Sequence, residues 1–540
     1  MLKNLIHLLL LSFISLTVLA ESNTTIEITG AEKPLENNIL LTLGSLQTSD
    51  LQGFFFDSRI NSAIKKSTQA LGFYHAQFSY QVQTDTNTLS INIQPGAVVT
   101  WGPAHIKVTS DAALPKKIQT LIDNHPFTPG TAINHSSYDD YKQRLFDSCL
   151  LMGFQGAKFQ RSELRIDLQN NLATTHIEIK TGKRYKINKV QYTGTSLSPE
   201  LLESLSVVKT SDWYSRSLIT QQYQSLLDTG YFKTVDVTPK LHHQQGLVDL
   251  VVTLEDVPGN QFLIGAGFGT DTGPRITLRW TKPLVNKSGH SLYSDLAVSK
   301  PIQELKASYQ IPVGHPLERY VEWATGIQNK NVEDTESLRL TTGLNLHTLH
   351  NKWQQVLGVN LENEAYSQGE DDTQKATYVL PTASWSYASI NPASEHSYRF
   401  LTNVQASTEE LYSDTNFFRM TAGIKYFLPL NANHAVITRL EIGRLFNNEF
   451  DQVPSSKRFF TGGDQTVRGY QFESISPRDS DDDLIGGDHL NVASLEYRWL
   501  FKPQWAVATF VDTGRAYFES SEPFRTGAGI GVRWLSPVGQ

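Results

Sequence analysis

Residues 493–501 read Ala-Ser-Leu-Glu-Tyr-Arg-Trp-Leu-Phe, a stretch in which apolar and polar side chains alternate at almost every position. The same alternation runs through 418–426 and 525–534. Successive side chains of a β-strand point to opposite faces. One face of each stretch is therefore apolar and ends in aromatic rings, while the other is polar, small or charged. This composition is typical of a strand between lipid and a water-filled lumen.

The alternating pattern fills the C-terminal half of the chain. We count about fourteen strands of this kind between Gln261 and Leu535. A soluble β-sandwich also alternates, but it turns its apolar face inward. Because an open sheet cannot span lipid, the pattern favours a transmembrane β-barrel over 259–540.

The connections between the predicted strands indicate an up-and-down order. Short turns at 429–433 and 502–504 alternate with longer acidic loops such as 364–374. In outer-membrane barrels the short turns face the periplasm and the long loops face the exterior. The longest loop, at about 448–489, is therefore predicted to be extracellular.

The first twenty residues have the pattern of a secretory signal peptide, with Lys3, an apolar run and then Ala20 before the expected cut. A membrane anchor is the alternative, but the run is short for a membrane-spanning helix. The formal net charge of −7 does not suggest a nucleic-acid partner. The single cysteine, Cys149, allows no internal disulfide, and its apolar neighbours predict a buried structural thiol.

Three similar α+β units precede the predicted barrel. Each unit opens with a strand, continues through helices that end in a Gly-aromatic turn, and closes with two strands. The turn glycines are Gly72, Gly153 and Gly230, spaced by about eighty residues, which suits a small domain. Glycine also favours the left-handed conformation that ends many helices. We predict three βααββ domains, at 21–97, 98–182 and 183–258.

The longest loop contains Thr-Gly-Gly-Asp-Gln-Thr-Val-Arg-Gly-Tyr at 461–470, a glycine-rich turn followed by Arg468. The ordinary outcome for such an arginine is a solvated loop charge. The alternative is an arginine folded into the barrel, because strand alternation places Glu496 and Asp512 on the lumen face. A charge-assisted pair shielded from water is stronger than a surface pair. We therefore predict a structural latch with Arg468 as the bolt, Asp512 as its principal partner and Glu496 as a second.

No catalytic constellation is recognisable, and we predict no enzymatic activity, no cofactor and no bound metal. The histidines are scattered, and the pair His242-His243 has no further ligands beside it. The acidic run at 479–483 carries the oxygen ligands that Ca²⁺ prefers, but a solvated acidic loop is the commoner outcome.

These features together resemble the TamA family, the outer-membrane subunits of translocation and assembly modules, within the BamA-like outer-membrane assembly superfamily. The resemblance covers essentially the whole chain, and its three repeats are similar to POTRA domains. Three such units favour TamA over BamA, which carries five, and over two-partner secretion pores, which carry two. The residues that match the motifs are Gly462, Gly463, Val467, Arg468, Gly469 and Tyr470 in the loop, Phe510, Asp512 and Gly514 on a strand, and Gly486-Gly487 followed by Glu496.

The resemblance implies a function and partners. It implies assembly of outer-membrane proteins such as autotransporters, from the outer membrane, with the repeats in the periplasm. It also implies an inner-membrane-anchored TamB-like partner that meets the N-terminal repeats, and contact with outer-membrane lipids. The alternatives are a secretion pore of the two-partner type or a conduit for lipid delivery.

The chain departs from the family pattern at its end. Relatives continue past a Ser-Pro-Val-Gly segment into two more strands, whereas this sequence stops at Ser536-Pro537-Val538-Gly539-Gln540. The resemblance implies sixteen strands where about fourteen are visible. We expect either a fragment or a barrel that differs from those of its relatives.

Overall fold

The computed structural model describes residues 24–44, 46, 51, 55–270, 272–369, 372–390, 396–518 and 522–534. The predicted leader at 1–20 and the closing segment 536–540 lie outside these residues. Within the described ranges, no helix is both long enough and apolar enough to cross a membrane. The chain divides into two compact units, and the division runs through the third repeat.

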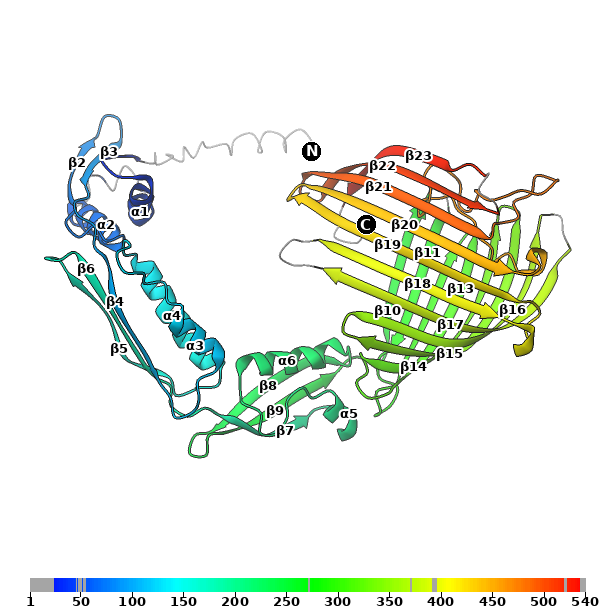
Figure 1. Cartoon of the computed structure of the whole chain (residues 1–540), viewed down its shortest axis with the longest axis horizontal. Coiled ribbons are helices and arrows are strands. Elements are labelled where there is room, and N and C mark those ends of the chain that lie inside the picture. Colours follow the sequence, from blue (N-terminus) through cyan, green and yellow to red (C-terminus); the bar gives the residue numbers. More distant parts are fainter. Residues whose placement is uncertain are drawn as a thin grey trace, which may run out of the picture. The chain divides into compact units, whose positions relative to one another are not determined.

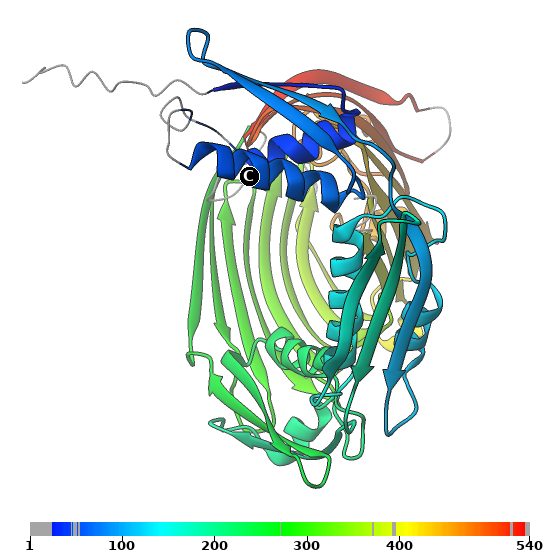
Figure 2. The same cartoon turned by 90° about the vertical axis from the view of Figure 1, so that its left-hand side faces the viewer.

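The first repeat contains three strands and two helices. Its strands form a sheet of order β1-β3-β2, in which β1 pairs with β3 in parallel and β2 pairs with β3 antiparallel. Ile39, Ile60 and Ile64 on the helices are buried against the apolar face of β3. Figure 2 shows both helices, in blue, on one side of the blue strands. The elements are β1 (Thr25–Thr29), α1 (Lys33–Leu43), α2 (Phe56–Ala70), β2 (Gln77–Gln83) and β3 (Thr88–Gln94).

The next two repeats have the same element order. Their sheets have the orders β4-β6-β5 and β7-β9-β8, so the last strand of each repeat lies in the middle of its sheet. The predicted βααββ topology is confirmed in all three repeats. The elements of the second repeat are β4 (Thr100–Thr109), α3 (Lys116–Asp123), α4 (His135–Leu151), β5 (Lys158–Asp167) and β6 (Leu172–Lys180). Those of the third are β7 (Lys186–Thr193), α5 (Pro199–Ser204), α6 (Arg216–Asp228), β8 (Phe232–His242) and β9 (Leu247–Asp256).

The glycine that ends each long helix has the left-handed conformation that the sequence predicts. The φ angles are +87° at Gly72, +94° at Gly153 and +70° at Gly230. At Gly153 a Cβ atom would lie 2.1 Å from the carbonyl oxygen of Tyr214. This position therefore requires glycine both for its backbone angle and for the close approach of the next repeat's chain.

The C-terminal half forms one antiparallel sheet of fourteen strands in chain order, as predicted (Figure 1). Each strand pairs with the one before it and the one after it, and β10 and β23 lie at the two ends of the order. The strands are β10 (Gln261–Gly269), β11 (Gly273–Lys282), β12 (Ser291–Ser299), β13 (Ile302–Pro312), β14 (Arg319–Val332), β15 (Thr335–His350), β16 (Trp353–Gln368), β17 (Gln374–Ile390), β18 (Ser397–Ser407), β19 (Phe417–Asn431), β20 (His434–Asn447), β21 (His489–Lys502), β22 (Trp505–Tyr517) and β23 (Arg525–Trp534).

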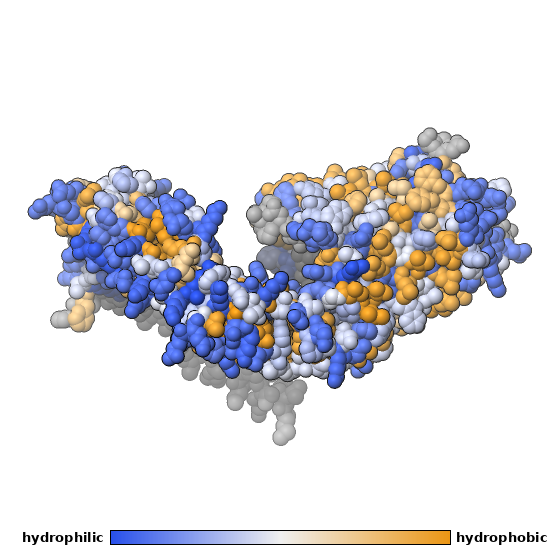
Figure 3. Space-filling model, turned by 60° about the horizontal axis from the view of Figure 1, so that its bottom comes forward, coloured by the Kyte–Doolittle hydropathy of each residue, from blue (hydrophilic) through white to orange (hydrophobic). Residues whose placement is uncertain are grey.

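The two faces of the barrel strands differ as their sequences predict. On β21, Leu495, Tyr497 and Trp499 are exposed on the outside, while Ser494 and Glu496 are buried on the lumen side. Figure 3 shows the hydrophobic side chains gathered over the outer surface of the barrel. This is the arrangement of a sheet that presents an apolar face to lipid and fills its interior with polar groups.

Two of the predicted connections were placed wrongly. Pro429 to Asn431 belong to β19, and only two residues separate that strand from β20, because the Asn431 side chain accepts the backbone N–H groups of Asn433 and His434 and closes the turn. The acidic segment 364–368 belongs to β16. Its first residue, Glu364, is fully buried and accepts two hydroxyl hydrogen bonds inside the barrel, so it is not a solvated loop charge.

Residues of the third repeat contact a short turn of the barrel. The Tyr231 hydroxyl donates to the carbonyl oxygen of Gly289 over 2.7 Å. The backbone N–H of Ser198 donates to the carbonyl oxygen of Lys287 over 2.8 Å. A Cβ atom at Gly289 would lie 2.5 Å from Leu201 Cδ2. The turn between β11 and β12 is therefore packed closely against this repeat.

Candidate functional site

The loop between β20 and β21 turns back on itself and enters the barrel. Short antiparallel bridges join Phe459 to Gly487 and Thr461 to Ile475, so the two arms of the loop run side by side. The backbone N–H and carbonyl groups of Phe459 and Gly487 exchange two hydrogen bonds of 2.8 Å. These bridges give the segment 461–475 a fixed shape, which is needed to aim one side chain at a defined point.

The glycine pair of the loop makes the turn that presents Arg468. Gly462 and Gly463 have φ angles of +109° and +97°, a region that side chains disfavour. A Cβ atom at Gly462 would lie 2.6 Å from the carbonyl oxygen of Gln471. The Gly462 N–H donates to Thr466 Oγ1, and Val467 is fully buried. The turn therefore seats Val467 in the lumen and positions the arginine that follows it.

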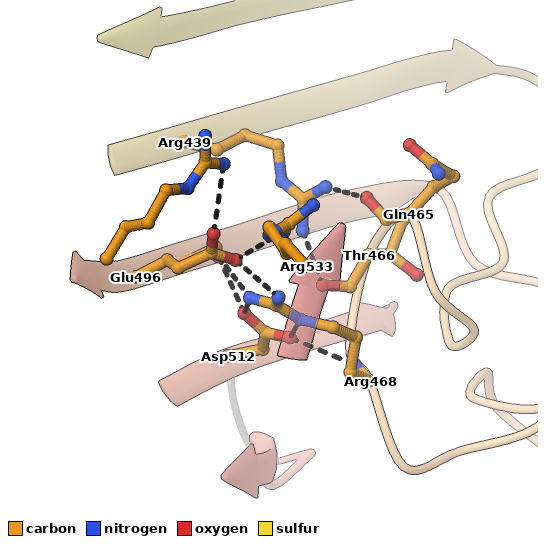
Figure 4. Close-up of polar contacts among 9 residues, drawn as sticks. Arg439, Gln465, Thr466, Arg468, Glu496, Asp512 and Arg533 are labelled. Carbon is orange, nitrogen blue, oxygen red and sulfur yellow. Dashed lines mark hydrogen bonds and ion pairs between the residues drawn. The ribbon is translucent and has the colours of Figure 1, made fainter. Parts of the chain in front are cut away.

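Arg468 lies against both of the predicted acids (Figure 4). Its Nε donates to Asp512 Oδ2 over 2.6 Å, and one terminal nitrogen donates to Asp512 Oδ1 over 2.9 Å. The other terminal nitrogen donates to Glu496 Oε2 over 2.7 Å. The hydrogen bonds that Arg468 donates to Asp512 raise the pKa of Arg468 further above its already high value. The planar fork of a guanidinium suits this two-sided grip on carboxylates.

The two acids are well shielded from water and fully partnered. Asp512 is 0% exposed, and Glu496 is 4% exposed. Ser494 donates to Asp512 Oδ1 over 2.6 Å. Glu496 also accepts from Arg498 and Arg533, at 3.3 and 2.8 Å. Burial of a carboxylate costs several kcal/mol unless it is paired and hydrogen-bonded, and both conditions are met here.

The neighbouring strands leave room for the loop by means of glycine. A Cβ atom at Gly527 would lie 1.9 Å from the carbonyl oxygen of Arg468, and one at Gly514 would lie 2.8 Å from Val467. The Phe510 ring lies under the guanidinium, whose central carbon is 3.6 Å from the ring centroid. This stacked cation and ring add an attraction that a carboxylate pair alone lacks. The motif residues Phe510 and Gly514 thus lie directly against the loop.

Comparison with known proteins identifies the family to which the barrel and its loop belong. The Omp85 superfamily domain matches residues 258–540, which include every strand of the barrel and the whole loop. The chain belongs to the Omp85 superfamily. As a member it is a non-enzymatic protein of the outer membrane, with its POTRA repeats in the periplasm, as predicted from the sequence.

Two of the repeats also match family domains. The first POTRA domain of TamA matches residues 25–95, and a general POTRA domain, described as a surface antigen variable number repeat, matches 185–256. A segment of 134 residues is 35% identical to the outer membrane protein assembly factor BamA of Nitratidesulfovibrio vulgaris. That segment is 23% of this chain and 17% of the length of that relative.

A solved structure of BamA shares the fold of this Omp85 protein. BamA from Haemophilus ducreyi lacking POTRA domains 1–3 superposes with a TM-score of 0.67 at 16% identity, over 81% of this chain and 94% of that one. CdiB from Acinetobacter baumannii gives a TM-score of 0.45 at 15% identity, over 81% of this chain and 84% of that one.

The remaining motif residues of the Omp85 chain lie around the loop. Tyr470 reaches the carbonyl oxygen of Thr526 on β23 over 3.5 Å. Gly469 has a φ angle of +95° and lets the chain turn away after the arginine. A Cβ atom at Gly487 would lie 2.5 Å from the backbone nitrogen of Tyr517 on β22. The pair Gly486-Gly487 thus lets the returning arm of the loop pass close to the wall.

Sequence reasoning missed several residues of the site. Arg439 on β20 donates to the backbone carbonyl oxygens of Gln465 and Thr466, so it holds the loop backbone just before the motif. Arg533 on β23 shares Glu496 with Arg468. Strand alternation puts both arginines on the lumen face, but it does not show which lumen residues meet a loop. His242, which the sequence left without a role, ends β8, and its Nε2 lies 3.1 Å from Asp249 Oδ2.

Proposed function

We propose that this protein is the outer-membrane component of a machine that inserts outer-membrane proteins, autotransporters among them, together with a TamB-like inner-membrane-anchored partner. The observation that carries the proposal is the match of residues 25–95 to the first POTRA domain of TamA, in a chain whose barrel belongs to the Omp85 superfamily. The first repeat is the one that would meet the partner.

The sheet of the first repeat supports a docking role. Its order β1-β3-β2 leaves β1 and β2 at the two edges, and an extended partner segment can add a strand to an edge through main-chain hydrogen bonds. Leu41 and Phe55 are 82% and 75% exposed on the helical side of the same repeat. A partner that covered these two side chains would remove their apolar surface from water, which favours binding.

The strand lengths of the barrel support a role in membrane insertion. Strands β10 and β12 have 9 residues each, whereas β16 and β17 have 16 and 17. Nine residues are the lower limit of the range of about 9–11 that crosses a bilayer. The barrel wall is therefore shortest at its first strands, β10 to β12. We infer that the bilayer is thinned there and that clients enter lipid beside β10.

The anchored loop supports a working barrel with an obstructed lumen. We infer that Arg468 acts as the bolt of a latch, with Asp512 and Glu496 as its partners, and that the latch keeps the wall of β21 to β23 in one arrangement. A two-partner secretion pore needs an open lumen instead. The contacts of Arg468 therefore favour assembly at the barrel wall over passage through the barrel.

Deletion of residues 25–95 from the full chain tests the proposal. The expected result is loss of co-purification with the TamB-like partner and loss of client assembly in cells, while the barrel remains heat-modifiable on a gel. A matched deletion of the second repeat controls for length and spacing. Unchanged partner co-purification without residues 25–95 would contradict the docking role, and a large steady conductance of the intact protein in planar bilayers would favour the pore.

A further inference from the structure

The root of the loop, Ser456 and Lys457, contacts strands of the barrel other than those that hold Arg468. Lys457 is 3% exposed, and its Nζ lies 2.5 Å from Glu362 Oε2 on β16. The preceding residue, Ser456, donates through its hydroxyl to Glu364 Oε2 over 2.6 Å. Strand β16 pairs with β15 and β17, so this contact is on a part of the sheet that shares no hydrogen bond with β21 or β22.

The two acids on β16 form a prepared receptor for the loop. Glu362 and Glu364 are two residues apart on one strand and therefore project from the same face into the lumen. They are 6% and 0% exposed. Ser337 on β15 donates to the second oxygen of Glu364 over 2.6 Å, and Arg339 lies 4.0 Å from Glu362. Two adjacent buried carboxylates repel each other, so a cation from the loop stabilises both.

The backbone of the root is held as well as its side chains. Arg419 on β19 donates through Nε to the carbonyl oxygen of Lys457 over 2.9 Å. The Arg419 guanidinium lies over the ring of Phe459, with its central carbon 4.5 Å from the centroid. Lys457 is thus gripped at its side chain from β16 and at its backbone from β19.

An open space in the lumen lies against this contact. It has a volume of about 520 Å³ and is lined by side chains of β12 to β16, β18 and β19. Ser456 and Lys457 are the loop residues among its described lining. Several of its lining residues are charged, including Glu304, Lys306 and Glu322. A polar space of this size holds water, and the loop root lies at its boundary.

We propose that Ser456 and Lys457 form a second anchor of the loop, independent of Arg468, which closes the loop root over the lumen space. The loop must then break its contacts with β16 as well as those of Arg468 with β21 and β22 before the lumen opens. Release of Arg468 alone leaves the root in place. The inference goes beyond the assembly function, because it concerns the state of the lumen whichever clients the protein handles.

Single-channel recording of the full-length protein in planar bilayers tests the second anchor. Lys457→Met leaves Glu362 and Glu364 buried without the loop cation, so the open fraction is expected to rise by about a hundredfold. Arg468→Ala should raise it less, and the combination of the two changes should give the largest conductance. Arg478→Ala is the matched control, because Arg478 is a half-exposed cation of the same loop. A Lys457→Met protein as closed as Arg478→Ala would overturn the proposal.

A charge exchange guards against simple misfolding. The protein with both Lys457→Glu and Glu362→Lys keeps the opposite pair in reversed positions. This variant is expected to be heat-modifiable. Its channel should be closed for nearly as large a fraction of the recording as that of the unchanged protein. If the exchange variant folds but conducts like Lys457→Met, the pair does not close the loop. If Lys457→Met does not fold, the same comparison is made between the exchange variant and Glu362→Gln.

Discussion

Arg468 holds Asp512 through its side chain and its backbone at once. Asp512 Oδ2 accepts from Arg468 Nε over 2.6 Å and from the Arg468 backbone N–H over 3.1 Å, while Oδ1 accepts from a terminal nitrogen over 2.9 Å. A side-chain pair alone would tolerate a shift of the loop backbone. The added backbone contact fixes where the loop crosses β22, and it makes the pair a positional constraint as well as an electrostatic one.

Removal of either partner of this pair should free the loop. Arg468→Ala leaves Asp512 buried without its cation, and Asp512→Ala leaves the guanidinium with one acid fewer, so each should cost about 3 kcal/mol of loop docking. Arg468→Lys should rescue in part, because an ammonium lacks the planar fork. Proteolysis near Arg478 in the intact membrane protein measures the docking equilibrium.

The double variant tests whether the two residues interact directly. Arg468→Ala with Asp512→Ala should cost less than the sum of the single changes, because the second removes a charge that the first has already left alone. Arg525→Ala, a change of an exposed arginine on β23, serves as the control. Strictly additive costs would mean that the two residues do not interact directly and that Arg468 is a solvated loop charge.

The contact between the third repeat and the barrel turn should depend on one hydroxyl. Burial raises the pKa of Tyr231, so its hydroxyl stays protonated and donates to the carbonyl oxygen of Gly289. Tyr231→Phe removes that hydrogen bond, at about 1 kcal/mol. Hydrogen exchange at the amide of Ser198, which donates to Lys287 on the same turn, should speed up about fivefold. Tyr223→Phe, on an exposed face of α6, should leave the exchange unchanged.

Much of the fold was predictable because it depends on periodicity. The alternation at 493–501 places Glu496 in the lumen, and the glycines at 72, 153 and 230 mark the ends of helices whatever surrounds them. The interpretation of Glu364 failed for a physical reason. An acid near the end of a strand looks like a solvated loop residue until its partners, Ser337 and Ser456, are brought to it by folding.

The candidate site was predictable only in its central residues. The loop motif pointed to Arg468, and strand alternation pointed to Asp512 and Glu496. Nothing in the spacing of Lys457 or Arg439 connects them to β16 or to the loop backbone, because those contacts join segments that are far apart in the chain. Long-range pairing of this kind follows from the register of the whole barrel, which local patterns do not determine.

Cys149 should be inert to thiol reagents in the folded protein. It is fully buried in α4, and burial raises the pKa of its thiol to about 11. Because the thiolate is the reactive form and burial disfavours it, labelling at pH 8 should be negligible and should increase only as the pH approaches 11. The same protein in denaturant should react fully at pH 8. Rapid labelling of the folded protein at pH 8 would show that the second repeat opens readily.

Two glycines of β23 offer a sharp test of how the loop is seated. A Cβ atom at Gly527 would lie 1.9 Å from the carbonyl oxygen of Arg468, whereas nothing lies within 4 Å of one at Gly531. Both glycines project from the same face of the strand, since they are four residues apart. Gly527→Ala should therefore push the loop out, at about 1–3 kcal/mol, and Gly531→Ala should not. Protease sensitivity near Arg478 reports the difference.

The same substitution distinguishes a clash with the loop from damage to the strand. If the cost of Gly527→Ala comes from displacing Arg468, then adding it to Arg468→Ala should add little, because the loop has already left its seat. Pairing of β22 with β23 should persist, and the barrel should remain heat-modifiable. Equal effects of Gly527→Ala and Gly531→Ala, or a full added cost on top of Arg468→Ala, would mean that β23 itself is disturbed and that the close approach of the loop does not explain the glycine.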